Sequence, residues 1–156
     1  MPAPLGEVLD FMRILWALDH GLQLTSKRMV TTWGLTGPQR MVIRLVGRFP
    51  NISAGHLAQA LHLHPSTLTG VLKRLEAREI LWRKPDPKDG RRALFGLTPK
   101  GRELNIPMRG TVESAIEAAL AKLPADTVKA AGDALAEIAR QLTDGLQTPR
   151  ERSSTA

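Results

Sequence analysis

Residues 65–78, PSTLTGVLKRLEAR, have the pattern of a helix with two dissimilar faces. Pro65 suits a first helical turn, where its missing amide hydrogen has no partner to lose. At 100° per residue one face is apolar and the other short and polar: Leu68, Val71, Leu72 and Leu75 lie opposite Ser66, Gly70, Lys73 and Ala77, which Thr69 and Arg74 flank. Glycine inside a helix costs ~1 kcal/mol relative to alanine. Gly70 on the polar face therefore indicates close approach by a large partner.

The residues before this helix predict a second short helix and a tight turn. Ser53 can cap a helix over AGHLAQAL, residues 54–61, and HLH, residues 62–64, is long enough only for a turn. Two short helices joined by three residues form a helix-turn-helix, whose second helix is 65–78.

The residues after it predict a hairpin with a basic tip. ILWR, residues 80–83, and ALFGL, residues 93–97, are short apolar runs that favour strands, and the turn sequence PDPKDG separates them. A hairpin of this size is not stable alone and must pack against helices. A turn needs the prolines and the glycine but not Lys88, Arg91 and Arg92, so the excess charge is either a solvated turn or a contact with an anion.

Longer helices flank this central part. An apolar pattern predicts a helix over 5–32, and Thr36 with Gln39 forms a capping box for a helix of about twelve residues. Thr98 and Pro99 begin a helix that we expect to reach about residue 123 with a kink at Pro107. Another follows Pro124 with an apolar seam that suits packing against another helix, either within the chain or between chains. We expect the aromatic side chains of Trp16, Trp33 and Phe49 in the core rather than in a ligand cage.

Composition points to a polyanionic partner. The chain has 156 residues, no cysteine and a formal net charge of +7. Residues 62–102 hold ten Lys or Arg against four acids, a net +6, whereas the remaining 115 residues hold twelve against eleven, a net +1. Without cysteine there is no thiolate nucleophile, disulfide or thiol-based oxidant sensor. No apolar run reaches the ~18 residues of a membrane span, and the acidic first twenty residues do not resemble a leader, so we expect a cytoplasmic protein.

The order of elements predicts a mainly α fold with a small two- to three-stranded antiparallel β wing, a winged helix-turn-helix. In this arrangement the second helix enters the DNA major groove and cations contact phosphate. An arginine of the wing can enter a minor groove. The predicted DNA-binding residues are Ser53, Ser66, Thr67, Thr69, Gly70, Lys73, Arg74, Lys88, Asp89, Arg91 and Arg92.

Six short motifs keep their mutual distances between residues 35 and 102. They are Leu35-Thr36-x-x-Gln39-x-x-Val42-Ile43, His56-Leu57-Ala58, Ser66-Thr67-Leu68-Thr69, Arg74-Leu75-Glu76, Asp89-x-Arg91 and Leu97-Thr98-x-x-Gly101. In order and spacing this set resembles the MarR family of bacterial transcriptional regulators. Outside that window only the layout of the long helices agrees.

The resemblance implies a homodimer built from the first and last two helices that binds a roughly palindromic operator. It further implies a ligand site between the dimerisation region and the DNA-binding region. It also implies that Asp89 orients Arg91 at the minor groove. It gives one domain over 1–148, with a DNA-binding part, 36–98, and a dimerisation part, 1–33 with 99–148; we expect 149–156 to be disordered. From helix placement, Trp16, His20 and Arg44 are candidates for a small anionic aromatic effector.

Two positions depart from the family pattern. Glu79 stands where the family usually has a glycine after the recognition helix, so the end of that helix must close without an easy left-handed residue. His64 stands where an acidic or small cap is usual, and we expect a less firmly set helix start.

Two other classes of function remain open. A DNA-coating protein without sequence preference would spread its cations over the surface, whereas here they are focused. An enzyme would need a nucleophile with its base, a phosphate loop or a metal cluster, and none is visible. His62 and His64 lie in a turn without a neighbouring carboxylate or thiol, so we predict neither metal nor cofactor.

Overall fold

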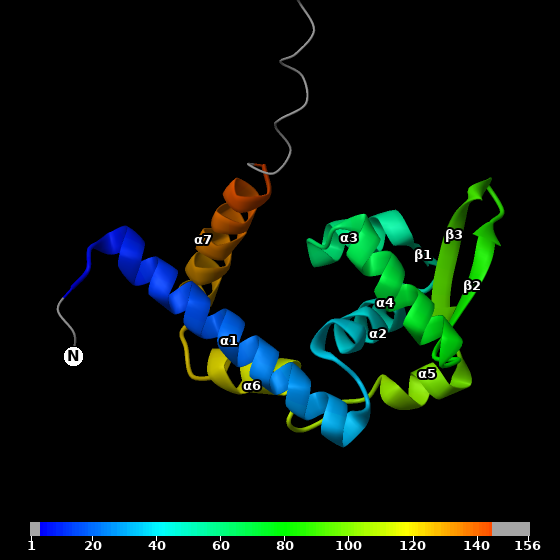
Figure 1. The fold of residues 1–156 in the computed structure, drawn as a ribbon, viewed down its shortest axis with the longest axis horizontal. Coiled ribbons are helices and arrows are strands. Elements are labelled where there is room, and N and C mark those ends of the chain that lie inside the picture. The colour runs from blue at the N-terminus through cyan, green and yellow to red at the C-terminus, as the bar shows by residue number, and fades with distance from the viewer. Residues whose placement is uncertain (1–3, 145–156) are drawn as a thin grey trace, which may run out of the picture. The chain divides into compact units, whose positions relative to one another are not determined.

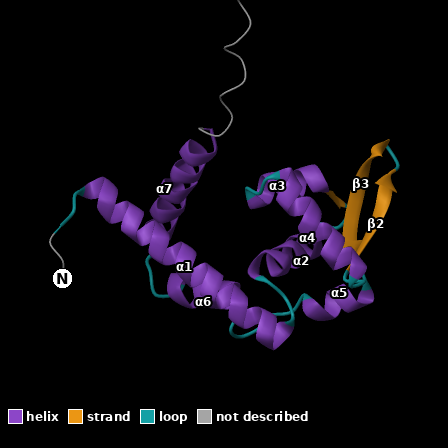
Figure 2. Ribbon diagram, in the orientation of Figure 1, coloured by secondary structure: helices purple, strands orange, loops and turns teal. Residues whose placement is uncertain are grey.

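The computed structural model describes residues 4–144 (Figures 1 and 2). In chain order its elements are α1 (Glu7–Trp33), α2 (Gly37–Arg48), β1 (Ile52–Ser53), α3 (Ala54–Leu61), α4 (Pro65–Ala77), β2 (Leu81–Asp86), β3 (Asp89–Leu97), α5 (Pro99–Leu104), α6 (Val112–Leu120) and α7 (Ala125–Asp144). The chain divides into two compact units, one up to Ser114 and one from Ala115 onward. The predicted disordered stretch, 149–156, lies outside the described residues.

The strands form the small antiparallel sheet that the sequence predicts. Its order is β1-β3-β2, so β3 is the central strand. Leu81 pairs with Leu97 at the base of the hairpin and Pro85 with Ala93 near its tip, while Ile52 of β1 pairs with Phe95 on the other edge. In Figure 1 the β2–β3 hairpin lies beside α4 and its turn is at the free end. The mainly helical fold with a three-stranded wing is confirmed.

One hydrophobic core joins α2, α3, α4 and the base of the hairpin. The apolar face of α4 contributes Leu68, Val71, Leu72 and Leu75, as its periodicity predicts. The other buried members are Leu35, Val42, Ile43, Val46, Leu57, Ile80, Leu81, Phe95 and Leu97. This core fixes the orientation of α4, because rotating the helix would expose its four leucine and valine side chains.

Three predicted helix caps are present. The Thr36 hydroxyl accepts a hydrogen bond from the amide of Gln39, whose side chain returns to the Thr36 amide, and this closes the capping box. Ser53 caps α3 through the amide of His56, and Thr98 caps α5 through the amide of Gly101. Such caps depend only on residues three positions apart, so local sequence is sufficient to predict them.

The predicted helix from residue 99 to about 123 is wrong, because the chain leaves helical geometry for seven residues instead of kinking. α5 ends at Leu104 and α6 begins at Val112. Pro107 provides no amide hydrogen and disfavours helical geometry at Ile106, while Gly110 adopts a left-handed φ of 73°. Thr111 then starts a new helix, since its hydroxyl accepts from the amide of Ser114.

The prediction that three aromatic side chains belong to the core is also wrong for the single chain. Trp16 is 65% exposed, Phe49 52% and Trp33 38%. On α1 only Met29 is buried, although apolar side chains recur along the helix. Their spacing was sufficient to predict the helix but not what covers it. No helix among residues 4–144 is long and apolar enough to cross a membrane.

Candidate nucleic-acid interface

The exposed side of α4 carries the polar residues that the sequence places there. Ser66, Thr67, Thr69, Lys73 and Arg74 are all exposed. An added Cβ at Gly70 would meet only the Arg74 guanidinium, at 4.0 Å. No packing inside this part of the chain therefore requires a glycine there, and its small size leaves room for a partner at the helix surface.

The start of α4 is held by an imidazole. The Nδ1 atom of His64 accepts a hydrogen bond from the backbone amide of Ser66 at 3.2 Å and contacts the Ser66 hydroxyl at 2.7 Å. His64 thus fills the N-cap role that serine or aspartate usually takes. The expectation of a less firmly set start is corrected, because Nδ1 lies where the oxygen of a capping aspartate would lie.

The end of α4 closes with a left-handed glutamate. Glu79 adopts a φ of 57°, and the amides of Glu79 and Ile80 donate to the carbonyl oxygens of Glu76 and Leu75 at 2.8 and 2.9 Å, which is the Schellman pattern. The start of α5 reinforces this end: the Thr98 hydroxyl donates to the Glu79 carbonyl at 2.6 Å. Both ends of α4 are therefore fixed in spite of the two departures from the family pattern.

The wing presents exposed cations, among them Lys88 and Arg91, outside the hydrophobic core. Pro87 and Lys88 form the turn, and the Asp86 carboxylate accepts from the Lys88 amide at 2.9 Å. The Asp89 carboxylate accepts from the Arg91 amide at 3.1 Å and lies 3.4 Å from Arg91 Nε. The side chain of Arg91 is 94% exposed. Asp89 therefore restrains the backbone and the Nε atom of Arg91 while the side chain stays in solvent.

A hollow of about 450 Å³ lies between α4, the wing and the start of α3. Cations dominate its charged lining, with Lys73 from α4, Arg83 from β2, and Arg91 and Arg92 from β3, against the single acid Glu76. Four cations around one hollow attract phosphate. The structure thus brings Thr69 and Lys73 of the helix together with Arg91 and Arg92 of the wing, and the most distant of these, Thr69 and Arg92, are 23 residues apart in sequence.

Ser53, Lys88 and Arg74 occupy different surroundings from this group. Ser53 lines the hollow but is 5% exposed, and its hydroxyl is engaged in capping α3. Lys88 lies at the wing tip and Arg74 on the exposed side of α4; neither lines the hollow. Of the predicted residues, Lys73, Arg91 and Arg92 have the side chains best placed to meet a polyanion together.

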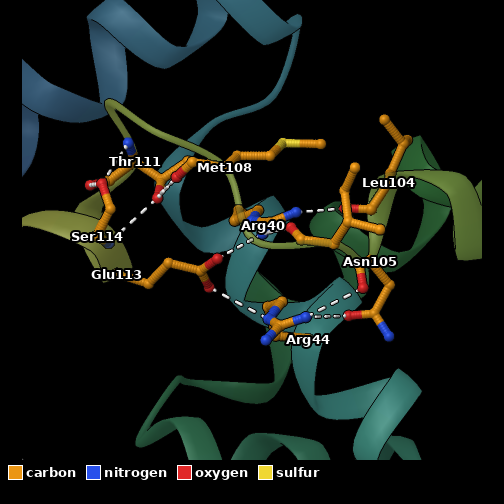
Figure 3. A network of polar contacts seen from close by, with 9 residues as sticks. Arg40, Arg44, Leu104, Asn105, Met108, Thr111, Glu113 and Ser114 are labelled. Carbon is orange, nitrogen blue, oxygen red and sulfur yellow. Dashed lines mark hydrogen bonds and ion pairs between the residues drawn. The ribbon is translucent and has the colours of Figure 1, made fainter. Parts of the chain in front are cut away.

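A polar network that the sequence does not reveal joins α2 to the residues around the end of α5 and the start of α6 (Figure 3). Arg40 is 3% exposed and donates to the carbonyl oxygens of Leu104 and Ile106 and to the Glu113 carboxylate. Its Nε has no partner among the described residues. Arg40 lies three positions before Ile43 on the buried side of α2. This spacing indicates that Arg40 is buried, a signal that sequence reasoning missed, but it does not identify the partners of Arg40.

The predicted ligand residues are not brought together. Arg44 lies 3.3 Å from the Glu113 carboxylate and donates to the Asn105 side chain at 2.8 Å. It borders a hollow of about 350 Å³ that neither Trp16 nor His20 lines. Both of those residues are exposed on α1. A ligand site at Trp16, His20 and Arg44 stays a prediction.

Comparison with known proteins places these features in a wider context. A family model described as the MarR family matches residues 33–92. An HTH-type transcriptional regulator of Bacillus subtilis is 34% identical over 98 residues, which cover 63% of this chain and 64% of that relative, slightly less than two thirds of its length. An HTH-type transcriptional repressor of Mycobacterium bovis is 30% identical over 123 residues, 79% of this chain and 84% of the relative.

The fold recurs in a solved complex with DNA. The structure of the S. aureus MepR–DNA complex covers 85% of this chain and 97% of its own, with a TM-score of 0.70 and 17% sequence identity. At that identity the likeness concerns the fold.

Proposed function

We propose that this chain, which belongs to the MarR family, is a DNA-binding transcriptional regulator that acts as a homodimeric, ligand-responsive repressor of a pseudo-palindromic operator. In this proposal α4 lies in the major groove and the wing, residues 85–92, lies at the minor groove. The relatives reported above are transcriptional regulators, not enzymes. The competing proposal within the DNA-binding class is a basic protein that coats DNA without sequence preference.

The cation-lined hollow between α4 and the wing is the observation that carries this proposal. Lys73 of α4 and Arg91 of β3 border the hollow. Ser66 and Thr69 offer short hydroxyl groups on the exposed side of α4. Cations position a protein on phosphate, and short polar side chains can reach base edges. A coating protein needs only the first of these. The combination favours a protein that reads sequence.

The apolar surface of α1 supports the homodimer. Val8 is 71% exposed and Trp16 65%. The same helix also exposes Leu9, Phe11, Ile14, Leu18, Leu22, Leu24 and Val30, and Leu5, just before its first residue, is exposed as well. α7 considered alone likewise exposes Leu135 and Leu142. So many exposed apolar side chains on one helix typically mark an interface between proteins. Sedimentation at micromolar concentration should show a dimer, and a monomer would remove the two-half-site operator from the proposal.

The same proposal assigns the parts of the chain and the mode of response. Residues 36–98 form the DNA-binding part, and 1–33 with 99–148 form the dimerisation part. Two recognition helices read half-sites one helical turn apart, ~34 Å. A small anionic aromatic effector at Trp16, His20 and Arg44 would favour a different spacing of the helices and release the operator, because a ligand shifts a population only through differential affinity.

Selection from a random DNA pool tests specificity, palindromy and half-site spacing together. We expect a recovered sequence with two inverted half-sites, bound ~10³-fold or more tightly than random DNA at the same salt concentration. Binding that falls with salt is not diagnostic, since all phosphate contacts behave in this way. Equal competition by random DNA would favour the coating protein instead.

A further inference from the structure

Two hydroxyl groups on the exposed side of α4 have partners inside the chain. The Ser66 hydroxyl oxygen lies 2.7 Å from His64 Nδ1, and the Ser66 amide donates to that same nitrogen at 3.2 Å. One turn later the Thr69 hydroxyl donates to the Pro65 carbonyl oxygen at 2.8 Å. Ser66 and Thr69 are both exposed, so each hydroxyl retains a side that a partner can reach.

These contacts favour one direction for each hydroxyl hydrogen. A backbone amide can only donate, so His64 Nδ1 accepts and carries no hydrogen. In the neutral tautomer with its hydrogen on Nε2, the Ser66 hydroxyl shares Nδ1 with the Ser66 amide and donates its own hydrogen to it. A carbonyl oxygen can only accept, so Thr69 must donate as well. Both hydroxyl groups consequently offer only lone pairs to a partner outside the chain.

An acceptor without a free hydrogen distinguishes the bases in the major groove. Adenine and cytosine present amino groups there, N6 and N4, whereas guanine and thymine present the acceptors O6 and O4 at the corresponding positions. An acceptor-only hydroxyl can pair with the amino groups and meets the keto oxygens as a mismatched acceptor. The choice concerns the base on the contacted strand, because every base pair carries one amino group in the major groove.

We propose that Ser66 and Thr69 select adenine or cytosine over guanine or thymine on the contacted strand, and that His64 sets this choice at Ser66 by holding its hydroxyl hydrogen. The proposal rests on the placement of α4 in the major groove that is proposed above. His64 acts here as a positioning residue, since it works through the Ser66 hydroxyl. Thr69 needs no such help, because its hydrogen goes to the backbone of its own helix.

Base analogues in the selected operator test the hydrogen-bond direction. Ser66→Ala and Thr69→Val first identify the two positions at which base preference is lost. Where such a position is adenine, purine removes the amino group and keeps N7, while 7-deazaadenine keeps the amino group and removes N7. We expect purine to weaken binding of the full-length dimer about tenfold and 7-deazaadenine to leave it unchanged. For cytosine, the pyrimidin-2-one analogue removes the amino group.

Two variants of His64 test its role, with the Thr69 position as internal control. His64→Ala frees the Ser66 hydroxyl to donate, so guanine or thymine should become as well accepted as adenine or cytosine at the Ser66 position only. His64→Asn retains a side-chain oxygen acceptor near the site of Nδ1 and should retain the preference. Melting curves check that both variants are folded. A purely structural role for His64 would lower affinity for all sequences alike and leave the preference unchanged.

Each result has a defined meaning. Three results would overturn the assignment. The first is a preference for guanine or thymine at the two mapped positions, and the second is weaker binding with 7-deazaadenine but not with purine. The third is an unchanged base preference in His64→Ala. Failure of the proposed function looks different, since wild-type protein would then show no preference for any selected site over random DNA. A specific protein whose preference ignores Ser66 and Thr69 would contradict this inference alone.

Discussion

Arg40 of α2 forms an ion pair with Glu113 at the start of α6, although 73 residues separate them. The same guanidinium donates to the carbonyl oxygens of Leu104 and Ile106. Those carbonyls belong to the end of α5 and the segment that follows it (Figure 3). The buried side chain of Arg40 thus connects α2 to the non-helical stretch that leads into α6.

Arg40→Met should lower the free energy of unfolding by about 2–3 kcal/mol. Breaking a buried ion pair costs about 3–5 kcal/mol, but the Glu113 side chain is 35% exposed and keeps Arg44 as a neighbour, so we expect a smaller loss. Chemical denaturation measures the change. Arg13→Met is the matched control: its exposed pair with Asp10 should contribute less than about 1 kcal/mol. Equal losses in the two variants would show that the Arg40 network carries no special stability.

Glu79→Gly should stabilise the protein by about 0.5–1 kcal/mol. Glu79 holds a φ of 57°, a conformation that costs a residue with a Cβ about 1–2 kcal/mol. Part of the gain is offset by the larger unfolded-state entropy of glycine. Glu79→Ala removes the same side chain but keeps the Cβ, and we expect no gain from it in denaturant titrations. A gain from alanine equal to that from glycine would attribute the effect to the charge.

Local chemistry was enough to predict several elements from the sequence. Thr36, Ser53 and Thr98 cap helices through amides three residues away, and the leucines of α4 recur at helical spacing. Lys73 and Arg91 can both be assigned to the DNA-binding surface from the sequence, because a helix-turn-helix followed by a hairpin has a known arrangement. In each case the partner lies nearby in sequence or the motif fixes its position.

Long-range relationships could not be predicted in the same way. The partners of Arg40 lie 64 or more residues away, and nothing near Arg40 indicates them. Trp16 was expected in the core because an apolar pattern gives the face of a helix without its neighbour. His64 was expected to cap weakly because residue preferences average over many sites, whereas here Nδ1 meets the Ser66 amide directly. The partners of Arg40 and the exposure of Trp16 depend on tertiary geometry, whereas the His64 cap is a local contact, two residues apart, that average residue preferences understate.

Gly96→Ala should destabilise the wing by about 1–3 kcal/mol. Trp82 lies across Gly96, its partner in the hairpin register, and an added Cβ would overlap the indole ring. Overpacking a buried site costs about that much. Gly90→Ala serves as control in the same hairpin, because a Cβ there meets nothing within 4 Å. Thermal unfolding should separate the two variants; similar melting temperatures would refute the close contact.

Glu137 of α7 should titrate at unusually low pH. The hydrogen bond from Arg140, followed by that from Gln141, lowers the pKa of Glu137 from 4.5 to about 2. A lowered pKa in the folded state means that the stabilising contribution is present above pH 4.5 and is lost as the pH falls toward 2. Carboxyl carbon chemical shifts should show this midpoint, and Arg140→Ala should raise it. An unchanged midpoint would exclude Arg140 as the main cause.

Lys73→Ala and Arg91→Ala should weaken DNA binding in different ways. Each removes about one phosphate-type contact, so the slope of log affinity against log salt should fall by about one where the cation meets phosphate. Arg91, extended from the wing, should matter most for operators with A·T-rich flanks, whose narrow minor grooves concentrate negative potential. Lys73→Ala should weaken binding to all sequences or change the preference at one base position.

Arg109→Ala is the control, because it removes an exposed cation outside the hollow. Fluorescence anisotropy across salt concentrations gives the slopes for all three variants. If Lys73→Ala and Arg91→Ala behave like Arg109→Ala, the DNA-binding surface lies elsewhere.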